Sequence, residues 1–246
     1  SAVATGSQMM QTITGAVLGL SMGGTVLIGH AIGEKEPEKA ARAVGTLAVL
    51  FAVIAAVCTA FMTLATGWVT GLLHTPREAF TYAKQYIFIC SSGIPFIIGY
   101  NAVSSIFRGI GDSKTPMYLV AAACLVNVVL DFLLVGVFHM GAAGAALATI
   151  AAQSLSFFLS LFIIARRGFP FDFGRQHFKP DSHAMKRILL VGTPLAVQDA
   201  LVNISFLIIT VIVNTMGVVA SASVGVVERY HTLIKESFKE FGISFD

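Results

Sequence analysis

Charged residues are scarce in this chain of 246 residues. Asp, Glu, Lys and Arg make up 12% of it, whereas apolar residues make up 56%. Soluble domains carry about 25% charged residues, and a soluble protein of this size needs a charged surface that this composition cannot supply. The net charge of +3 is also small, so we expect no nucleic-acid partner. We therefore expect an integral membrane protein.

Cysteines and catalytic motifs are also rare. Cys58, Cys90 and Cys124 lie singly inside apolar runs, which favours packing over a disulfide or a metal site. The sequence has no G-x-S-x-G, no H-E-x-x-H and no Walker motif. We expect a protein that is not an enzyme, that holds no cofactor and that uses an ion gradient. The chain opens at Ser1 without a signal peptide, so we expect a further helix upstream.

Apolar segments of spanning length, about 20 residues, recur along the chain. This repetition predicts an all-α, polytopic transmembrane helix bundle. The six predicted spans are residues 3–32, 44–73, 86–107, 117–138, 141–165 and 188–216.

The segments between these spans alternate in charge. The first, third and fifth carry nearly all the basic residues, and basic segments stay in the cytoplasm. The fifth, residues 166–187, is the longest and contains Pro170, Gly174 and Pro180. We interpret it as a cytoplasmic linker between two bundles. A docking site for anionic lipid headgroups is the alternative.

An acidic side chain inside a span marks a candidate functional site, because its insertion costs about 2.5–3.5 kcal/mol. Asp131 lies in the fourth span, and Asn127 precedes it by one helical turn. The short turn at 139–141 makes the next span antiparallel, which brings Thr149 to a similar depth. These hard oxygen ligands suit Na⁺ or a proton. A purely structural bond between Asp131 and Asn127 is the alternative.

Asp199 is the second acid well inside a span. It lies beside Gln198 and follows Pro194, so it is a candidate for lining a polar cavity or for packing. Gln153, one turn after Thr149, is a further candidate for the cavity.

Three motifs in order resemble the MATE (multidrug and toxic compound extrusion) family. They are Arg108-Gly-Ile-Gly-Asp-Ser-Lys-Thr-Pro116, Asn127-Val-Val-Leu-Asp131 and Gly141-Ala-Ala-Gly-Ala-Ala-Leu-Ala-Thr149. Gly192-Thr-Pro194 resembles the start of the family's seventh helix. Some branches of the family carry an acidic residue in the seventh helix, but its position falls a few residues after that of Asp199. In this respect the sequence is similar to the DinF-type branch.

The resemblance implies half of a twelve-helix fold with two lobes around a central cavity. Residues 1–165 would be N-lobe helices two to six, 166–187 the inter-lobe linker and 188–229 the start of the C-lobe. The tail, 230–246, departs from the family because Lys235, Glu236, Lys239 and Glu240 interrupt it. The family's N-lobe cation site matches Asn127, Asp131 and Thr149.

The implied function is export of amphipathic, cationic drugs in exchange for H⁺ or Na⁺. The implied setting is a bacterial cytoplasmic membrane, with membrane lipids as partners and a monomer as the full-length state. A lipid-linked oligosaccharide flippase of the same superfold is one alternative, although no span carries a mid-membrane basic residue. A truncated membrane fragment without transport activity is the other.

Overall fold

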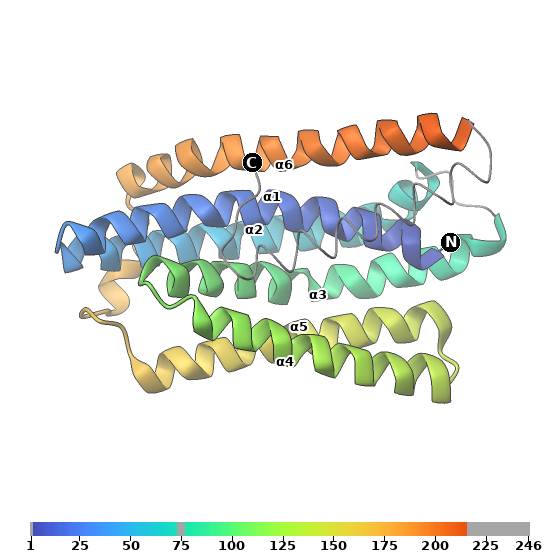
Figure 1. Ribbon diagram of the computed structural model, residues 1–246, viewed down its shortest axis with the longest axis horizontal. Helices are drawn as coiled ribbons and strands as arrows, with labels where there is room; N and C mark the ends of the chain where they lie inside the picture. Colours follow the sequence, from blue (N-terminus) through green and yellow to red (C-terminus); the bar gives the residue numbers. More distant parts are fainter. Residues whose placement is uncertain (1, 73–76, 216–246) are drawn as a thin grey trace. The chain divides into compact units, whose positions relative to one another are not determined.

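The computed structural model describes residues 2–72 and 77–215, and within these ranges the chain is helical with no strand (Figure 1). The predicted all-α bundle is confirmed. The elements in order are α1 (Ala2–Gly33), α2 (Pro37–Leu72), α3 (Arg77–Gly109), α4 (Lys114–Asp131), the π-helix η1 (Phe132–Val137), α5 (Gly141–Arg167), the 3₁₀ turn η2 (Arg175–Phe178) and α6 (Ser182–Thr215).

Five helices in the described ranges are long and apolar enough to cross a bilayer. The chain is therefore a multi-pass membrane protein. The five segments coincide with the first five predicted spans and cover Thr14–Gly33, Pro37–Leu64, Phe88–Gly109, Lys114–Val137 and Gly141–Arg167. The sixth predicted span falls on α6 but runs to residue 216, outside the described residues, where the predicted tail also lies.

The core lies between α1, α2 and α3, where Ile28, Leu47 and Ile94 are fully buried. Helix α3 also packs against α5, so it is the most enclosed of the five spans. Pro95 lies inside α3, and the helix continues through it. By contrast, the most apolar window of α4 has no buried residue, so α4 lies at the edge of the bundle.

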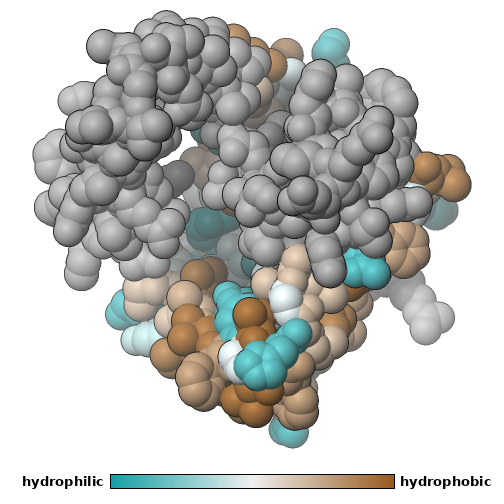
Figure 2. Space-filling view, turned by 90° about the vertical axis from the view of Figure 1, so that its right-hand side faces the viewer, coloured by the Kyte–Doolittle hydropathy of each residue, from teal (hydrophilic) through white to brown (hydrophobic). Residues whose placement is uncertain are grey.

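The sides of the bundle are apolar, as a bilayer requires. Side chains such as Leu125, Val128 and Phe132 are more than half exposed. Figure 2 views the end that carries the α4–α5 turn, and its described surface is mostly hydrophobic with a few polar groups between. In water, apolar sides of this kind would be an association site, whereas in a membrane these sides face acyl chains.

Small residues let α1 and the first part of α6 approach closely. A side chain at Gly19 would overlap the Ala196 backbone, and one at Gly23 would overlap the Ile188 carbonyl oxygen. Gly192 of α6 faces Leu20 in the same way. Only glycine permits this separation, which is how many membrane helices pack.

The segment from residue 168 to 181, here called the linker segment, is fixed to α2. The backbone N–H of Asp181, at the end of this segment, donates to the Thr46 hydroxyl of α2 over 3.1 Å. The ring of His177 is 4% exposed, and the His177 carbonyl oxygen lies where a Gly45 side chain would be. Phe169, Phe171 and Phe173 pack against the core.

The chain divides into two compact units, Ser1–Val197 and Gln198–Asp246, with the division inside α6. The predicted lobe boundaries at residues 165, 187 and 229 stay predictions. Asn127, Asp131, Thr149 and Gln153 belong to the first unit, and Gln198 and Asp199 belong to the second.

Candidate cation-coupling site

Asn127 and Asp131 lie on one face of α4, separated by one helical turn, and both are half-buried. The Asn127 Nδ2 and Asp131 Oδ1 atoms are buried and have no hydrogen-bond partner in the described structure. Buried polar groups are normally paired, so each unpaired group at this site calls for an explanation. The purely structural bond that the sequence left open does not form between these two atoms.

The backbone changes form directly after Asp131. Helix α4 ends there, and the π-helix η1 carries the chain from Phe132 to Val137. Phe138 then donates its N–H to the Leu133 carbonyl, five residues back. Short π segments are frequent at functional sites, and no residue pattern indicated this one.

A three-residue connection, residues 138–140, joins η1 to α5, which confirms the predicted short turn. The tightness comes from two residues with positive φ, His139 at 52° and Gly141 at 57°. Glycine adopts this conformation without strain, and histidine does so uncommonly. The turn makes α4 and α5 an antiparallel, contacting pair.

Thr149 and Asp131 lie nine residues after and nine residues before Met140, and their similar depth stays a prediction. The Thr149 hydroxyl donates to the Ala145 carbonyl of its own helix over 2.9 Å. That leaves the Thr149 oxygen free to accept. In the described structure no hydrogen bond joins Thr149 to Asn127 or Asp131, so the predicted trio is not hydrogen-bonded.

The outlying candidates differ from this trio. Gln153 is half-buried on α5, one turn from Thr149. Gln198 and Asp199 are exposed, and they belong to the second unit, so their place relative to Asp131 stays open.

The site offers oxygen ligands and one ionisable group. Rotating the Asn127 amide by half a turn exchanges its nitrogen for its oxygen, so it can face either a carboxylate or a cation. Oxygen donors of this kind suit Na⁺ or a proton rather than a transition metal. Residues 2–72 and 77–215 contain no cluster of three or more His, Cys, Asp or Glu side chains suited to a metal.

Sequence reasoning missed a polar network at the other end of α4. Asp112 accepts the Thr115 N–H over 3.0 Å and the Thr115 hydroxyl over 2.6 Å. Arg167, the last residue of α5, lies 3.3 Å from Asp112 and 3.1 Å from the Thr115 hydroxyl. Asp112 and Thr115 both belong to the motif at 108–116. The motif therefore starts α4 and ties it to α5.

This network stabilises the ionised form of the Asp112 carboxyl group. Partial burial raises the pKa of its carboxyl group, but the Thr115 hydrogen bonds and the Arg167 charge outweigh burial and leave the pKa below its ordinary value. The lowered pKa favours the ionised form of Asp112, so we do not count it among the candidate proton carriers.

A family model and the most similar relatives found agree on one family of proteins. A model of the MatE family matches residues 1–133. The probable multidrug resistance protein YpnP of Bacillus subtilis is 30% identical over 95% of this chain and 52% of its own length. The multidrug export protein MepA of Staphylococcus haemolyticus is 24% identical over 83% of this chain and 45% of its own length. The chain spans about half the length of the curated relatives it matches.

Solved structures share the fold. A MOP superfamily transporter from Pyrococcus furiosus has a TM-score of 0.88 at 24% identity, over 97% of this chain and 53% of its own. An outward-facing MATE family transporter has a TM-score of 0.86 at 23% identity, over 98% of this chain and 53% of its own. The helical arrangement described above is thus that of one half of these transporters.

Proposed function

Because this chain belongs to the MATE family of transporters, whose family model covers its residues 1–133, we propose that it forms part of a secondary antiporter. The exported molecules are amphipathic and cationic drugs, and the coupling ion is H⁺ or Na⁺. The names of its relatives, multidrug resistance and multidrug export proteins, support the export of drugs. A bacterial cytoplasmic membrane is the proposed location, with a monomeric, full-length transporter as the working state.

The observation that carries this proposal is the pair of buried, unpartnered atoms on Asn127 and Asp131. An acidic group within a span is costly, and leaving its neighbours unpaired adds to the cost. A transported cation offsets that cost whenever it binds. The site is then most stable when loaded, as a coupling site must be.

Each residue has a defined part in this scheme. Asp131 takes up the proton, or pairs its charge with Na⁺. Asn127 turns its amide oxygen toward Na⁺, or donates an N–H to the carboxylate once the ion has left. Thr149 keeps its hydrogen on the Ala145 carbonyl, so its oxygen remains an acceptor for Na⁺ or for a protonated Asp131.

The coupling itself follows from alternating access. Loading the site from outside removes the net charge of Asp131, and this change favours the conformation that releases the drug. One monovalent cation moving down 100 mV supplies about 2.3 kcal/mol. That corresponds to roughly 50-fold accumulation of an exported molecule at 1.4 kcal/mol per decade.

The test is efflux of a fluorescent lipophilic cation from vesicles that contain the full-length transporter, under imposed H⁺ and Na⁺ gradients. Asp131→Asn should abolish gradient-driven efflux, and thermal unfolding should show that the variant is folded. Asp172→Asn is the matched control, because Asp172 is an exposed carboxylate in the linker segment. Normal efflux by Asp131→Asn would rule out this site, and efflux independent of both gradients would rule out antiport.

A further inference from the structure

The ends of α1, α2 and α6 lie together at the end of the bundle opposite the α4–α5 turn (Figure 1). Side chains from all three helices line a hollow there. It has a volume of about 230 Å³. Leu27 and small residues form its apolar lining, and charged side chains of both signs surround them. The span in α1 ends at Gly33 and the next begins at Pro37, so the hollow lies at the level of lipid headgroups.

The cations of this hollow are not equally engaged. Lys39 lies 2.8 Å from Glu36, and the Arg42 Nε lies 3.2 Å from Glu38. Arg187, which also lines the hollow, has no acidic partner in the part of the chain that the structure describes. Arg187 is thus the natural contact for a phosphate.

A carboxylate on the same hollow is loosely held. Glu34 lies 3.7 Å from the His30 ring and 3.9 Å from Lys39, which are long contacts for ion pairs. Glu34 therefore retains the capacity to accept hydrogen bonds from an ammonium group. A free cation and an underused carboxylate on one small cavity fit a ligand that carries both charges better than a simple anion.

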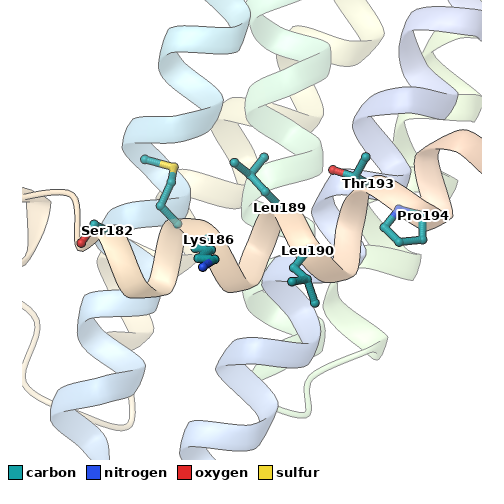
Figure 3. Close-up of a pocket in the computed structure, with 7 residues that line it drawn as sticks. Ser182, Lys186, Leu189, Leu190, Thr193 and Pro194 are labelled. Carbon is teal, nitrogen blue, oxygen red and sulfur yellow. The ribbon is translucent and has the colours of Figure 1, made fainter.

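An apolar groove adjoins the hollow along α6 (Figure 3). It has a volume of about 590 Å³ and is lined only by α6, from Ser182 to Pro194, with Lys186 as its one charged side chain. Figure 3 shows Leu189 and Thr193 on one side of the helix and Leu190 on the other, so two ridges flank the groove. Its length is about 18 Å at 1.5 Å per residue, comparable with one leaflet of a bilayer core of about 30 Å.

The two sites meet on the surface of α6. Arg187 lines the hollow, whereas Leu190 and Pro194 line the groove. These three residues follow one another at helical spacing, so they form one continuous strip. A charged end and an apolar extension of one leaflet's length describe a phospholipid.

We propose that this hollow and groove bind a zwitterionic phospholipid of the phosphatidylethanolamine class from the cytoplasmic leaflet. Its phosphodiester contacts Arg187, its primary ammonium contacts Glu34, and one acyl chain lies along Leu190 and Pro194. The groove also suits a packed helix, but a helix would leave the two charged contacts unfilled. The proposal does not depend on transport, because binding alone tests it.

The experiment is native mass spectrometry of the purified protein with added lipid, comparing phosphatidylethanolamine with its N-methylated derivatives up to phosphatidylcholine. The series keeps both charges but removes the ammonium N–H donors. Affinity should fall as methyl groups are added. Arg187→Gln should weaken phosphatidylethanolamine binding roughly fivefold, equivalent to about 1 kcal/mol for one basic residue at a membrane surface. Glu34→Gln should flatten the methylation series.

Lys179→Gln is the matched control, since Lys179 is an exposed cation outside both cavities, and it should bind like the unaltered protein. Several results would overturn the proposal. Equal binding across the methylation series would exclude ammonium recognition. Tighter binding of phosphatidylglycerol would show an anion site, and competition by soluble phosphoethanolamine without lipid chains would show a small-molecule site. Equal affinity in Arg187→Gln would remove the headgroup contact.

Discussion

Replacing Asp112 tests how the motif at 108–116 builds the fold. The carboxylate accepts the N–H of Thr115, the second residue of α4, and also lies 3.3 Å from Arg167 at the end of α5. Asp112→Ala removes both interactions. Loss of a helix cap costs about 0.5–2 kcal/mol, and an exposed ion pair is worth about 0.2–1 kcal/mol. We expect a total loss of about 1–3 kcal/mol in the free energy of unfolding.

A second variant separates the two contributions. Asp112→Asn keeps a cap, because asparagine ranks with aspartate at this position, but it loses the charge. It should therefore cost only about 0.2–1 kcal/mol, the value of the exposed ion pair. Arg167→Gln should cost a similar amount, and adding it to Asp112→Asn should cost little more, because both changes remove the same pair.

The pH dependence has a definite sign. The pKa of Asp112 is lowered in the folded protein, so its stabilisation is complete above the ordinary aspartate pKa of about 3.9 and is lost as pH falls through the lower, folded value. The stability difference between the unaltered protein and Asp112→Asn should therefore shrink at pH values below about 4.

Reversible unfolding in mixed micelles, followed by far-ultraviolet circular dichroism, measures these differences at neutral and acidic pH. If Asp112→Ala were as stable as the unaltered protein, the capping role would be wrong. If Asp112→Asn were as damaging as Asp112→Ala, the charge rather than the cap would carry the effect. If the stability difference between the unaltered protein and Asp112→Asn did not change with pH, the lowered pKa of Asp112 would be contradicted.

Two further predictions concern the linker segment. Gly45→Ala places a methyl group on the His177 carbonyl oxygen and should cost about 1–3 kcal/mol by overpacking, whereas Gly33→Ala, which meets open space, should not. Faster proteolysis within 168–181 and a lower Tm for Gly45→Ala alone would check this; equal behaviour of the two variants would contradict it. His177→Phe keeps the ring but leaves the Gly174 N–H unpaired, at about 1–3 kcal/mol. Thermal unfolding should therefore rank it below Glu38→Gln, and the reverse order would refute the assigned role.

The prediction for His177→Phe rests on the two hydrogen bonds of the His177 ring. Its Nδ1 accepts the Gly174 N–H over 3.1 Å, so the hydrogen must be on Nε2, which faces Glu38 over 3.3 Å. The ring stacks on Phe173 with centroids 5.7 Å apart. A histidine with both ring nitrogens in use holds the linker segment against α2.

The spans could be predicted because the bilayer leaves little choice. Backbone groups in lipid must be satisfied within a helix or a closed barrel, so long apolar runs such as Met117–Phe138 could only be helical. The antiparallel pairing of α4 with α5 followed in the same way, since a very short connection permits only an antiparallel neighbour. Both inferences used local pattern and no knowledge of distant contacts.

Other features could not be predicted because they depend on partners far apart in sequence. Nothing in the local sequence distinguishes His177 from the other polar residues of a charged loop, because its burial depends on Glu38 and Gly45. The pairing of Arg167 with Asp112 likewise joins two separate segments. The π-helix η1 has a different cause, because apolar residues such as Leu133 and Val135 fit either helical form equally well.

The π-helix after Asp131 has a consequence for experiments that map surfaces residue by residue. Along α4 a lipid-facing stripe repeats with the 3.6-residue period of an α-helix. Between Phe132 and Val137 the hydrogen bonds span five residues instead, so the stripe changes phase. A single-cysteine labelling scan should show that break just after Asp131, and a helical wheel drawn straight through it would assign the outer residues to the wrong face.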